Sequence, residues 1–231
     1  MSSFLPTNQL LLDFHTHNKS STSTYFPINS VFLSESSNID TSLPHTVGIH
    51  PWHVSSNITR EHDSLLRNLS SKIIAIGEIG LDKPSAKVNS NYNLQLNVFH
   101  KQLTIAQQTG LPVVVHCVKA YDDLLKVKRE FPSVKMAIHG FTGSFELASS
   151  LIQKGFYLSF GNSLLKSPKL AHLGKLPSSR IFLETDTAGN SLGNVYDKAA
   201  DLMDLNIDEL RLLIWENAIN FFGNRIFEFI K

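Results

Sequence analysis

The sequence lacks several features that would place it in a specialised class of protein. Cys117 is the only cysteine among 231 residues, so no disulfide can form within the chain, which suits a reducing compartment. With 21 basic and 20 acidic residues the formal charge is +1, and no basic run indicates an extended surface for nucleic acid or an anionic membrane. No apolar run approaches the ~20 residues of a membrane span, and the start has no signal-peptide pattern. We therefore expect a cytoplasmic protein with no membrane partner.

Several catalytic motifs are also missing. No serine lies in a G-x-S-x-G elbow, and neither a P-loop nor a dinucleotide-binding fingerprint occurs. Cys117 follows His116, but alternation along a strand would send the two side chains to opposite faces. We therefore expect Cys117 to be a small buried residue and not a nucleophile.

Short apolar runs of the kind that form buried strands recur along the whole chain. Hydrophobic residues make up 42% and charged residues 18%, so the chain can bury a large core. From the fourth run onward, stretches of helical periodicity separate the runs, and no linker interrupts them. This alternation predicts a single α/β domain over residues 1–231, a (β/α)8 TIM-type barrel. The expected strands are Leu10–His15, Ser30–Glu35, His45–His50, Ile73–Glu78, Pro112–Cys117, Lys135–Gly140, Phe156–Gly161 and Arg180–Asp186.

The beginning of this pattern is thinner than the rest. Asn18–Asn29 and Ser36–Pro44 are rich in Ser, Thr and Asn and lack the periodicity of a full helix, so the barrel is expected to be trimmed around its first two βα units. Alternation would turn Leu12 and Phe14 outward, where covering helices normally pack. Either the tail Ile226–Ile230 or a second copy of the protein would then cover them. We favour the tail, because its Phe and Ile residues need burial, and monomer and homodimer both stay open.

Residue types that bind metals gather at the ends of five expected strands. His15 and His17 follow the first strand as His-x-His, and alternation points both imidazoles to the same side. The carboxyl ends of barrel strands are where such enzymes assemble their active sites. Four imidazoles and two carboxylates suit two divalent ions with open positions for water. The candidate ligands are His15, His17, Glu78, His116, His139 and Asp186.

Each of these residues alone has an ordinary structural explanation. A single histidine near a strand end is more often a hydrogen-bonded structural residue, and a single acidic residue there is often a helix cap. The joint pattern of six ligand-type residues at corresponding positions favours a metal site. His50, in Gly-Ile-His-Pro-Trp-His, is equally consistent with a substrate contact and with a capping or core residue.

Short motifs around these residues follow one another in a definite order. They are Asp13–His17 (DFHTH), Val47–Pro51 (VGIHP), Ile76–Asp82 (IGEIGLD), Pro112–Cys117 (PVVVHC), His139–Gly143 (HGFTG), Glu184–Asp186 (ETD) and Glu216–Ala218 (ENA). In these motifs and their order, the chain resembles the TatD family of metal-dependent deoxyribonucleases, within the amidohydrolase-like metal-dependent hydrolase barrels. The resemblance covers nearly the whole chain. It implies a TIM-type barrel, the six residues above as metal ligands, and phosphodiester hydrolysis.

Three departures from the family pattern concern the substrate. After His-Cys the family usually has an arginine and an acidic residue, whereas this chain has Val118 and Lys119. A lysine lacks the bidentate geometry with which arginine binds phosphate. Asn18–Ser20 follows the first motif in place of the usual acidic or apolar helix, and Thr187–Asn190 follows the last strand in place of Ala-Pro. We expect metal chemistry to be retained and leave the substrate open.

The ligand set and the resemblance together predict a metal-dependent hydrolase, a phosphodiesterase or deoxyribonuclease acting on DNA ends or small phosphate esters. Two divalent ions (Zn²⁺, Mn²⁺ or Mg²⁺), bridged through Glu78, would activate water, with Asp186 as ligand and general base. Lys119 and His50 are the expected substrate contacts. Two alternatives stay open: an amidohydrolase-type hydrolase of a carboxylic ester or amide, and a non-catalytic metal-binding interaction module.

Overall fold

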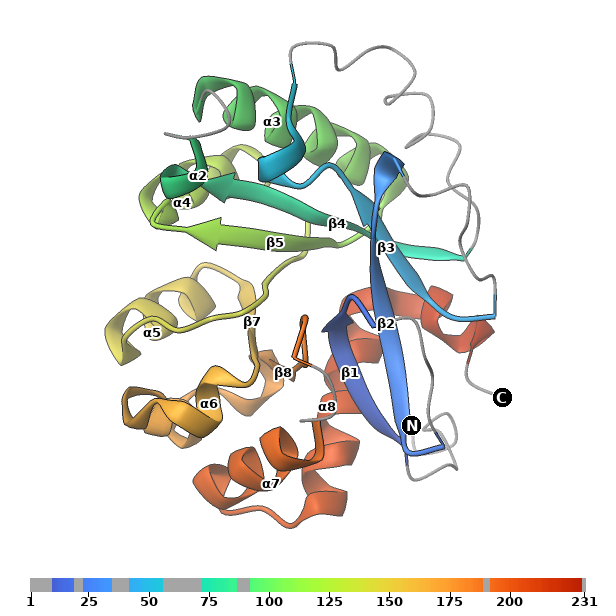
Figure 1. The fold of residues 1–231 in the computed structure, drawn as a ribbon, viewed down its shortest axis with the longest axis vertical. Helices are drawn as coiled ribbons and strands as arrows, with labels where there is room; N and C mark the ends of the chain where they lie inside the picture. Colours follow the sequence, from blue (N-terminus) through green and yellow to red (C-terminus); the bar gives the residue numbers. More distant parts are fainter. Residues whose placement is uncertain are drawn as a thin grey trace. The chain divides into compact units, whose positions relative to one another are not determined.

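The computed structural model describes residues 10–18, 23–34, 42–55, 72–86, 92–188 and 192–229 (Figure 1). The chain divides into two compact units. We call Ser30–Ile138 the central unit, and Met1–Asn29 together with His139–Lys231 the terminal unit. The organisation of residues 1–231 as a single domain stays a prediction.

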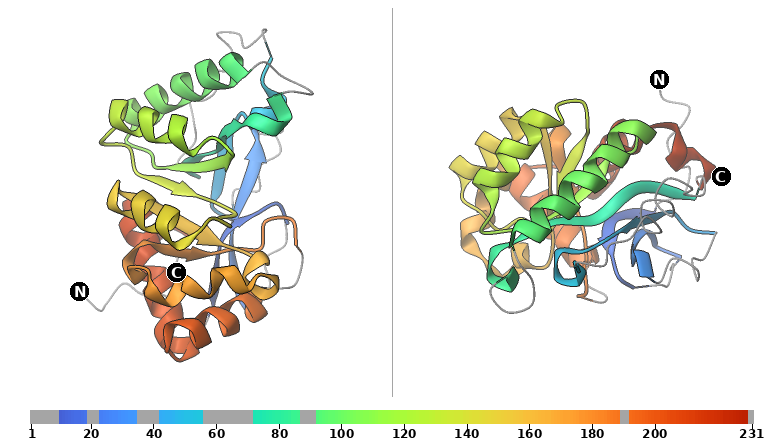
Figure 2. Two further views of the ribbon diagram at one scale, coloured as in Figure 1. Left: turned by 90° about the vertical axis from the view of Figure 1, so that its left-hand side faces the viewer. Right: turned by 90° about the horizontal axis from the view of Figure 1, so that it is seen from above.

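The central unit is a parallel sheet with helices packed against it. Its strands are rich in Val and Ile and are buried on both faces, as parallel strands covered by helices should be. Figure 2 shows α3 (Tyr92–Thr109) and α4 (Tyr121–Glu130), in green, beside β4 and β5. The paired strands are β3 (His45–Gly48), β4 (Ile73–Asp82), β5 (Val113–Val118) and β6 (Met136–Ile138), and the short helices are η2 (Pro51–His53) and α2 (Lys83–Ala86).

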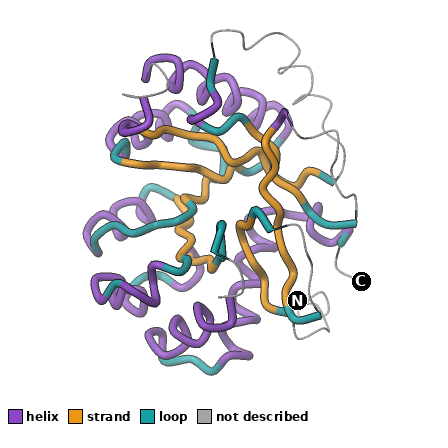
Figure 3. Tube along the Cα trace, viewed as in Figure 1, coloured by secondary structure: helices purple, strands orange, loops and turns teal. Residues whose placement is uncertain are grey.

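The terminal unit contains two further parallel strand pairs. Strand β1 (Leu11–Thr16) pairs with the first part of β2 (Tyr25–Phe32), up to Asn29, and β7 (Phe156–Phe160) pairs with β8 (Ile181–Leu183). Figure 3 shows helices and strands following one another in this part of the chain. The helical segments are α5 (Phe145–Gln153), α6 (Ser163–Lys166), η3 (Pro168–Lys175), η4 (Ser178–Arg180), α7 (Leu192–Met203), α8 (Ile207–Phe222) and η5 (Gly223–Glu228).

The ends of α8 follow from local hydrogen bonding. Asn206 caps the helix by accepting from the backbone N–H of Glu209, while the Glu209 side chain accepts from the backbone N–H of Asn206. This reciprocal arrangement satisfies two N–H groups that the first turn leaves unpaired. The helix ends at Gly223, whose φ of 68° lies in the left-handed region that glycine adopts without strain.

Helices α7 and α8, from the C-terminal part of the chain, contact β1. Leu12 and Phe14 are fully buried. The Phe14 ring stacks on Phe182 at 4.0 Å and contacts two phenylalanines of α8, Phe221 and Phe222. The tail contributes the fully buried Ile226, while Ile230 lies outside the described residues. Helix α8 therefore covers part of this flank, and the expected contribution of the tail stays a prediction.

Several observed strands have other bounds than expected, and two of the differences concern the start and the end of the sheet. The run Ser30–Glu35 is wrong in position, because β2 occupies Tyr25–Phe32 and begins inside a segment expected to be irregular. Pro27 obscured it, since proline is rare inside strands, yet the neighbouring Phe26 and Ile28 are buried. Strand β8 ends three residues before Asp186. Among the described residues, no α-helix connects β1 to β2 or β2 to β3, in agreement with the predicted trimmed start.

Candidate metal centres

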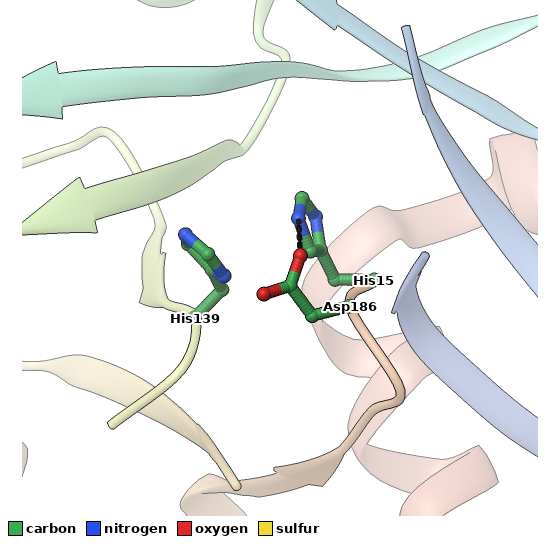
Figure 4. A group of neighbouring side chains, drawn as sticks. All are labelled: His15, His139 and Asp186. Atoms are coloured by element: carbon green, nitrogen blue, oxygen red, sulfur yellow. Dashed lines mark ion pairs between the residues drawn. The ribbon is translucent and has the colours of Figure 1, made fainter. Parts of the chain in front are cut away.

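The first group of candidate ligands lies in the terminal unit. One ligand atom from each of His15, His139 and Asp186 lies within 4.8 Å of the other two. Figure 4 shows the three side chains turned toward a common space. His15 Nε2 is 3.8 Å and His17 Nε2 is 3.7 Å from Asp186 Oδ1. Two or three imidazoles with one carboxylate form a donor set that fits a divalent ion such as Zn²⁺ or Mn²⁺.

Main-chain hydrogen bonds hold this group together. The N–H of Asp186 donates to the carbonyl of His15 at 2.9 Å, and the N–H of His17 donates to the carbonyl of Asp186 at 3.1 Å. Asp186 has a φ of 53°, in the left-handed region that aspartate tolerates better than most residues. Its side chain is 43% exposed, whereas that of His15 is fully buried. The aspartate is thus the solvent-facing member of the group.

Two further carboxylates support the terminal-unit group. Asp13 accepts hydrogen bonds from the N–H and the hydroxyl of Thr185, at 2.8 and 2.6 Å. Burial raises the pKa of Asp13 to about 7, although these hydrogen bonds act to lower it. Glu184 accepts from the N–H of Gly140 at 2.7 Å, and its Oε1 lies 3.5 Å from Nδ1 of His139. Burial acts to raise the pKa of Glu184, but the bond and charge of His139 outweigh it and lower that pKa.

Glu184 is a residue that the sequence interpretation missed. It belongs to the same Glu-Thr-Asp motif as Asp186, and only the aspartate was taken as functional. Carboxylates that bind the second nitrogen of a ligating histidine fix its ring orientation. Glu184 is placed to orient His139 in this way, because its Oε1 lies 3.5 Å from Nδ1 of that histidine.

The second group lies in the central unit. Glu78 Oε1 is 3.1 Å from Nε2 of His50 and 2.7 Å from Nδ1 of His116. All three side chains are buried or nearly so, and one ligand atom from each lies within 4.8 Å of the others. The structure therefore brings together the two predicted ligands Glu78 and His116, and adds His50, which was expected to contact substrate.

The hydrogen bonds of His50 argue against metal binding by this residue. Its Nδ1 accepts from the backbone N–H of Trp52 at 3.1 Å, so it caps η2. A neutral imidazole carries one proton, which must then stand on Nε2 and be donated to Glu78. His50 in this geometry orients the Glu78 carboxylate and has no lone pair to offer on that nitrogen.

His116 has a carboxylate at each ring nitrogen. Glu78 lies at Nδ1, and Asp82 Oδ2 lies 3.1 Å from Nε2. A neutral imidazole can donate to only one of these acceptors, so the other contact requires a second proton or a cation. Glu78 and His116, with Asp82 beside them, are therefore candidate donors for a cation.

Asp82 is the second residue that the sequence interpretation missed. Glu78 was expected to end its strand, but β4 continues to Asp82. Asp82 accepts from the indole N–H of Trp52 at 2.7 Å and from the N–H of Ser85 at 2.8 Å. Burial acts to raise the pKa of Asp82, but these bonds and His116 outweigh it, so the pKa is lowered. Asp82 is the final residue of the Ile76–Asp82 motif, and this position could have identified it from the sequence.

Gly80 allows β4 and β5 to approach closely beside His116. The two residues are register partners, and a Cβ on Gly80 would overlap the carbonyl oxygen of His116. Its φ of 146° is also unfavourable for other residues. Lys119, the other predicted substrate contact, is exposed just after β5 with a φ of 54°.

A pocket of about 150 Å³ opens beside His50 in the central unit. Its lining is mostly apolar and includes Phe32, Ile49 and His53. The rings of Phe32 and His53 meet edge to face at 4.6 Å, so aromatic groups form one side.

Buried imidazole and carboxylate groups of this kind, on an α/β scaffold, define a metal-dependent hydrolase. Residues 19–223 match the model of the TatD related DNase family, and the chain belongs to that family. Among the residues that the structure describes, no helix is long and apolar enough to cross a membrane.

Individual relatives agree with this assignment. The chain is 29% identical over 197 residues to YabD of Bacillus subtilis, an uncharacterized metal-dependent hydrolase, with 76% of each chain covered. It is 32% identical over 152 residues to the 3'-5' ssDNA/RNA exonuclease TatD of Erwinia tasmaniensis, covering 61% of this chain and 56% of that protein. The crystal structure of the TatD homologue YjjV from Escherichia coli matches with a TM-score of 0.77 at 22% identity, covering 92% of this chain and 98% of that one. This likeness confirms the predicted (β/α)8 TIM-type barrel.

Proposed function

We propose that this metal-dependent hydrolase is a nuclease that cleaves phosphodiester bonds at the ends of single-stranded nucleic acid. The observation that carries the proposal is the group His15, His139 and Asp186, in which two buried imidazoles adjoin a partly exposed carboxylate. The similarity to a 3'-5' ssDNA/RNA exonuclease supports this class of substrate. The charge of +1 does not oppose it, because an enzyme that acts on ends needs only a small phosphate contact.

The donor groups suggest one ion for each unit. His15, His139 and Asp186, with His17 beside them, would hold one, and Glu78 with His116 would hold the other. Bound divalent ions lower the pKa of water and stabilise charge on a phosphoryl oxygen. Imidazole and carboxylate donors suit Zn²⁺ or Mn²⁺, and the family also admits Mg²⁺. The role of Glu78 as a bridge between the two ions stays a prediction.

The protein's own groups have separate roles in this proposal. Asp186 accepts the proton of the attacking water, since its carboxylate faces solvent and its backbone is fixed to His15. Lys119 contacts phosphate through its exposed ammonium group. His50 donates to Glu78, so a positioning role is better supported for it than direct contact with substrate.

Metal content and hydrolysis measured on the same protein test this proposal. We expect close to two divalent ions per chain at saturation and hydrolysis of single-stranded DNA labelled at either end, with all activity lost on chelation. The double variant His15→Ala/His17→Ala should lose an ion and the activity. His100→Ala is a matched control, because this histidine pairs with Glu130 on the surface of the central unit.

The outcomes separate this function from its alternatives. Unchanged metal content and activity in the double variant would remove the terminal-unit group from the chemistry. Turnover of carboxylic esters or amides without cleavage of DNA would favour an amidohydrolase-type activity. Metal binding with no turnover on any of these substrates would favour an interaction module.

A further inference from the structure

Trp52 is an exposed aromatic residue beside the central-unit ligands. It is the most exposed large hydrophobic side chain among the described residues, at 53%, whereas Trp215 is fully buried. The centroid of its ring lies 4.8 Å from that of His50 and 6.0 Å from that of His116. Single exposed apolar residues are common on protein surfaces, so exposure alone does not indicate a role. The position of this ring beside His50 and His116, together with the contacts that hold it, does indicate a role.

Two hydrogen bonds and a neighbouring proline restrict Trp52. The indole N–H donates to Asp82 at 2.7 Å, and the backbone N–H donates to His50. Pro51 begins the short helix η2 on which Trp52 stands, and its ring restricts the backbone there. A tryptophan fixed in this way loses little side-chain entropy when a ligand binds, which favours binding.

The same contacts decide what the ring can offer to a ligand. The N–H is the only polar atom of an indole, and here it is already bound to Asp82. More than half of the side chain is exposed, and the indole has no second polar atom with which to form a conventional hydrogen bond. Because its N–H is bound to the Asp82 carboxylate, the ring offers an incoming strand no donor for a phosphate, whereas a nucleobase can pack against it.

We propose that Trp52 is a substrate-binding residue whose ring stacks on a nucleobase of the single-stranded substrate. This inference rests on the proposed function as a nuclease. Stacking on an aromatic side chain tolerates every base, because each base has a π face. The Trp52 ring would therefore position a nucleic-acid strand beside Glu78 and His116 without requiring a particular base sequence.

The first test measures binding of a short phosphorothioate-linked single-stranded oligonucleotide to the metal-loaded protein. Trp52→Ala should weaken binding by roughly fivefold to a hundredfold, the usual effect of removing one base–aromatic stack. Trp52→Phe keeps a ring but loses the N–H that holds it to Asp82, so its affinity should lie between those of the wild type and Trp52→Ala. If Trp52→Phe binds as weakly as Trp52→Ala, an aromatic ring at this position contributes nothing and the stacking inference is wrong.

A set of oligonucleotides that each lack one base tests whether Trp52 touches a base. In the wild-type protein, one abasic position should weaken binding by about the same factor as Trp52→Ala. In Trp52→Ala, the same abasic position should cause no further loss of affinity, because two changes that remove one contact are not additive. An equal abasic penalty in both proteins would place that base elsewhere, for example in the pocket beside His50, and would overturn the inference.

Fluorescence provides a readout that does not depend on affinity. Oligonucleotide binding should quench tryptophan emission in the wild type and in Trp215→Phe, but not in Trp52→Phe. Quenching that survives Trp52→Phe would contradict stacking at Trp52. Normal binding and hydrolysis by Trp52→Ala would overturn this inference and leave the nuclease proposal standing, whereas a wild-type protein that neither binds nor cleaves oligonucleotides would overturn both.

Discussion

The backbone N–H of Asp186 donates a 2.9 Å hydrogen bond to the carbonyl oxygen of His15. Two candidate ligands from distant parts of the sequence are thus joined through their main chains as well as through their side chains. Because the backbone is fixed, a change in the Asp186 side chain can be made without moving His15.

Asp186→Asn should reduce kcat by about 10²–10⁴-fold and change KM little, because the amide cannot accept the proton of the attacking water. Asparagine has nearly the same size and also tolerates a φ of 53°, so folding should be preserved. Steady-state kinetics on labelled single-stranded DNA measure the effect. Asp204→Asn is the matched control, since Asp204 has a φ of 54° and lies outside the group. A near-normal kcat for Asp186→Asn would exclude a general-base role.

Substitutions at Lys119 should act on KM. Lys119→Gly removes the ammonium group and relieves the positive φ of 54°, so KM should rise while kcat and stability are maintained. Lys119→Arg should lower KM, because a guanidinium binds phosphate in a bidentate manner. Lys154→Ala, on an exposed helix end, serves as the control. If glycine and arginine at position 119 both left KM unchanged, Lys119 would not contact the substrate.

Asp82→Asn should weaken binding of the central-unit ion by about 10–100-fold, the usual effect of losing a carboxylate that orients a ligating histidine. Asp82 holds Nε2 of His116 at 3.1 Å, and an amide provides no negative charge there. Calorimetric metal titration would show one site weakened and the other unchanged. Asp122→Asn, on the exposed side of α4, should bind both ions normally. If Asp82→Asn bound both ions with unchanged affinity, Asp82 would not support His116 in metal binding.

Cys117 should resist alkylation in the folded protein. Burial raises the pKa of its thiol from 9.0 to about 12, so the native state keeps the proton at a pH where the unfolded chain has released it. Iodoacetamide should therefore react slowly at pH 8 and rapidly after denaturation. The same difference lowers the stability of the fold as pH rises from about 9 to 12. Equal rates for native and denatured protein at pH 8 would show that the thiol is accessible.

The structure brings His15, His139 and Asp186 together because each stands at or just beyond the carboxyl end of a parallel strand, and their role as metal ligands stays a prediction. His15, His139 and Asp186 needed only the positions of three strands to be placed together. Asp82 was missed because no periodicity shows that β4 continues beyond Glu78. The role of His50 depends on which ring nitrogen accepts the Trp52 N–H, and that contact exists only in the folded backbone.

The terminal unit is formed by two segments that lie far apart in the sequence. This separation affects when the unit can fold during synthesis. Thr16 and Asp186, which pair beside its candidate ligands, are separated by 170 residues, whereas the central unit is one continuous stretch. At roughly 5–20 residues per second, a ribosome needs roughly 10–30 s to travel that distance. The central unit can begin to fold on the nascent chain during this interval. His15 cannot yet contact Asp186, because that residue has not been synthesised. The terminal-unit group can therefore be completed only after Asp186 has been synthesised.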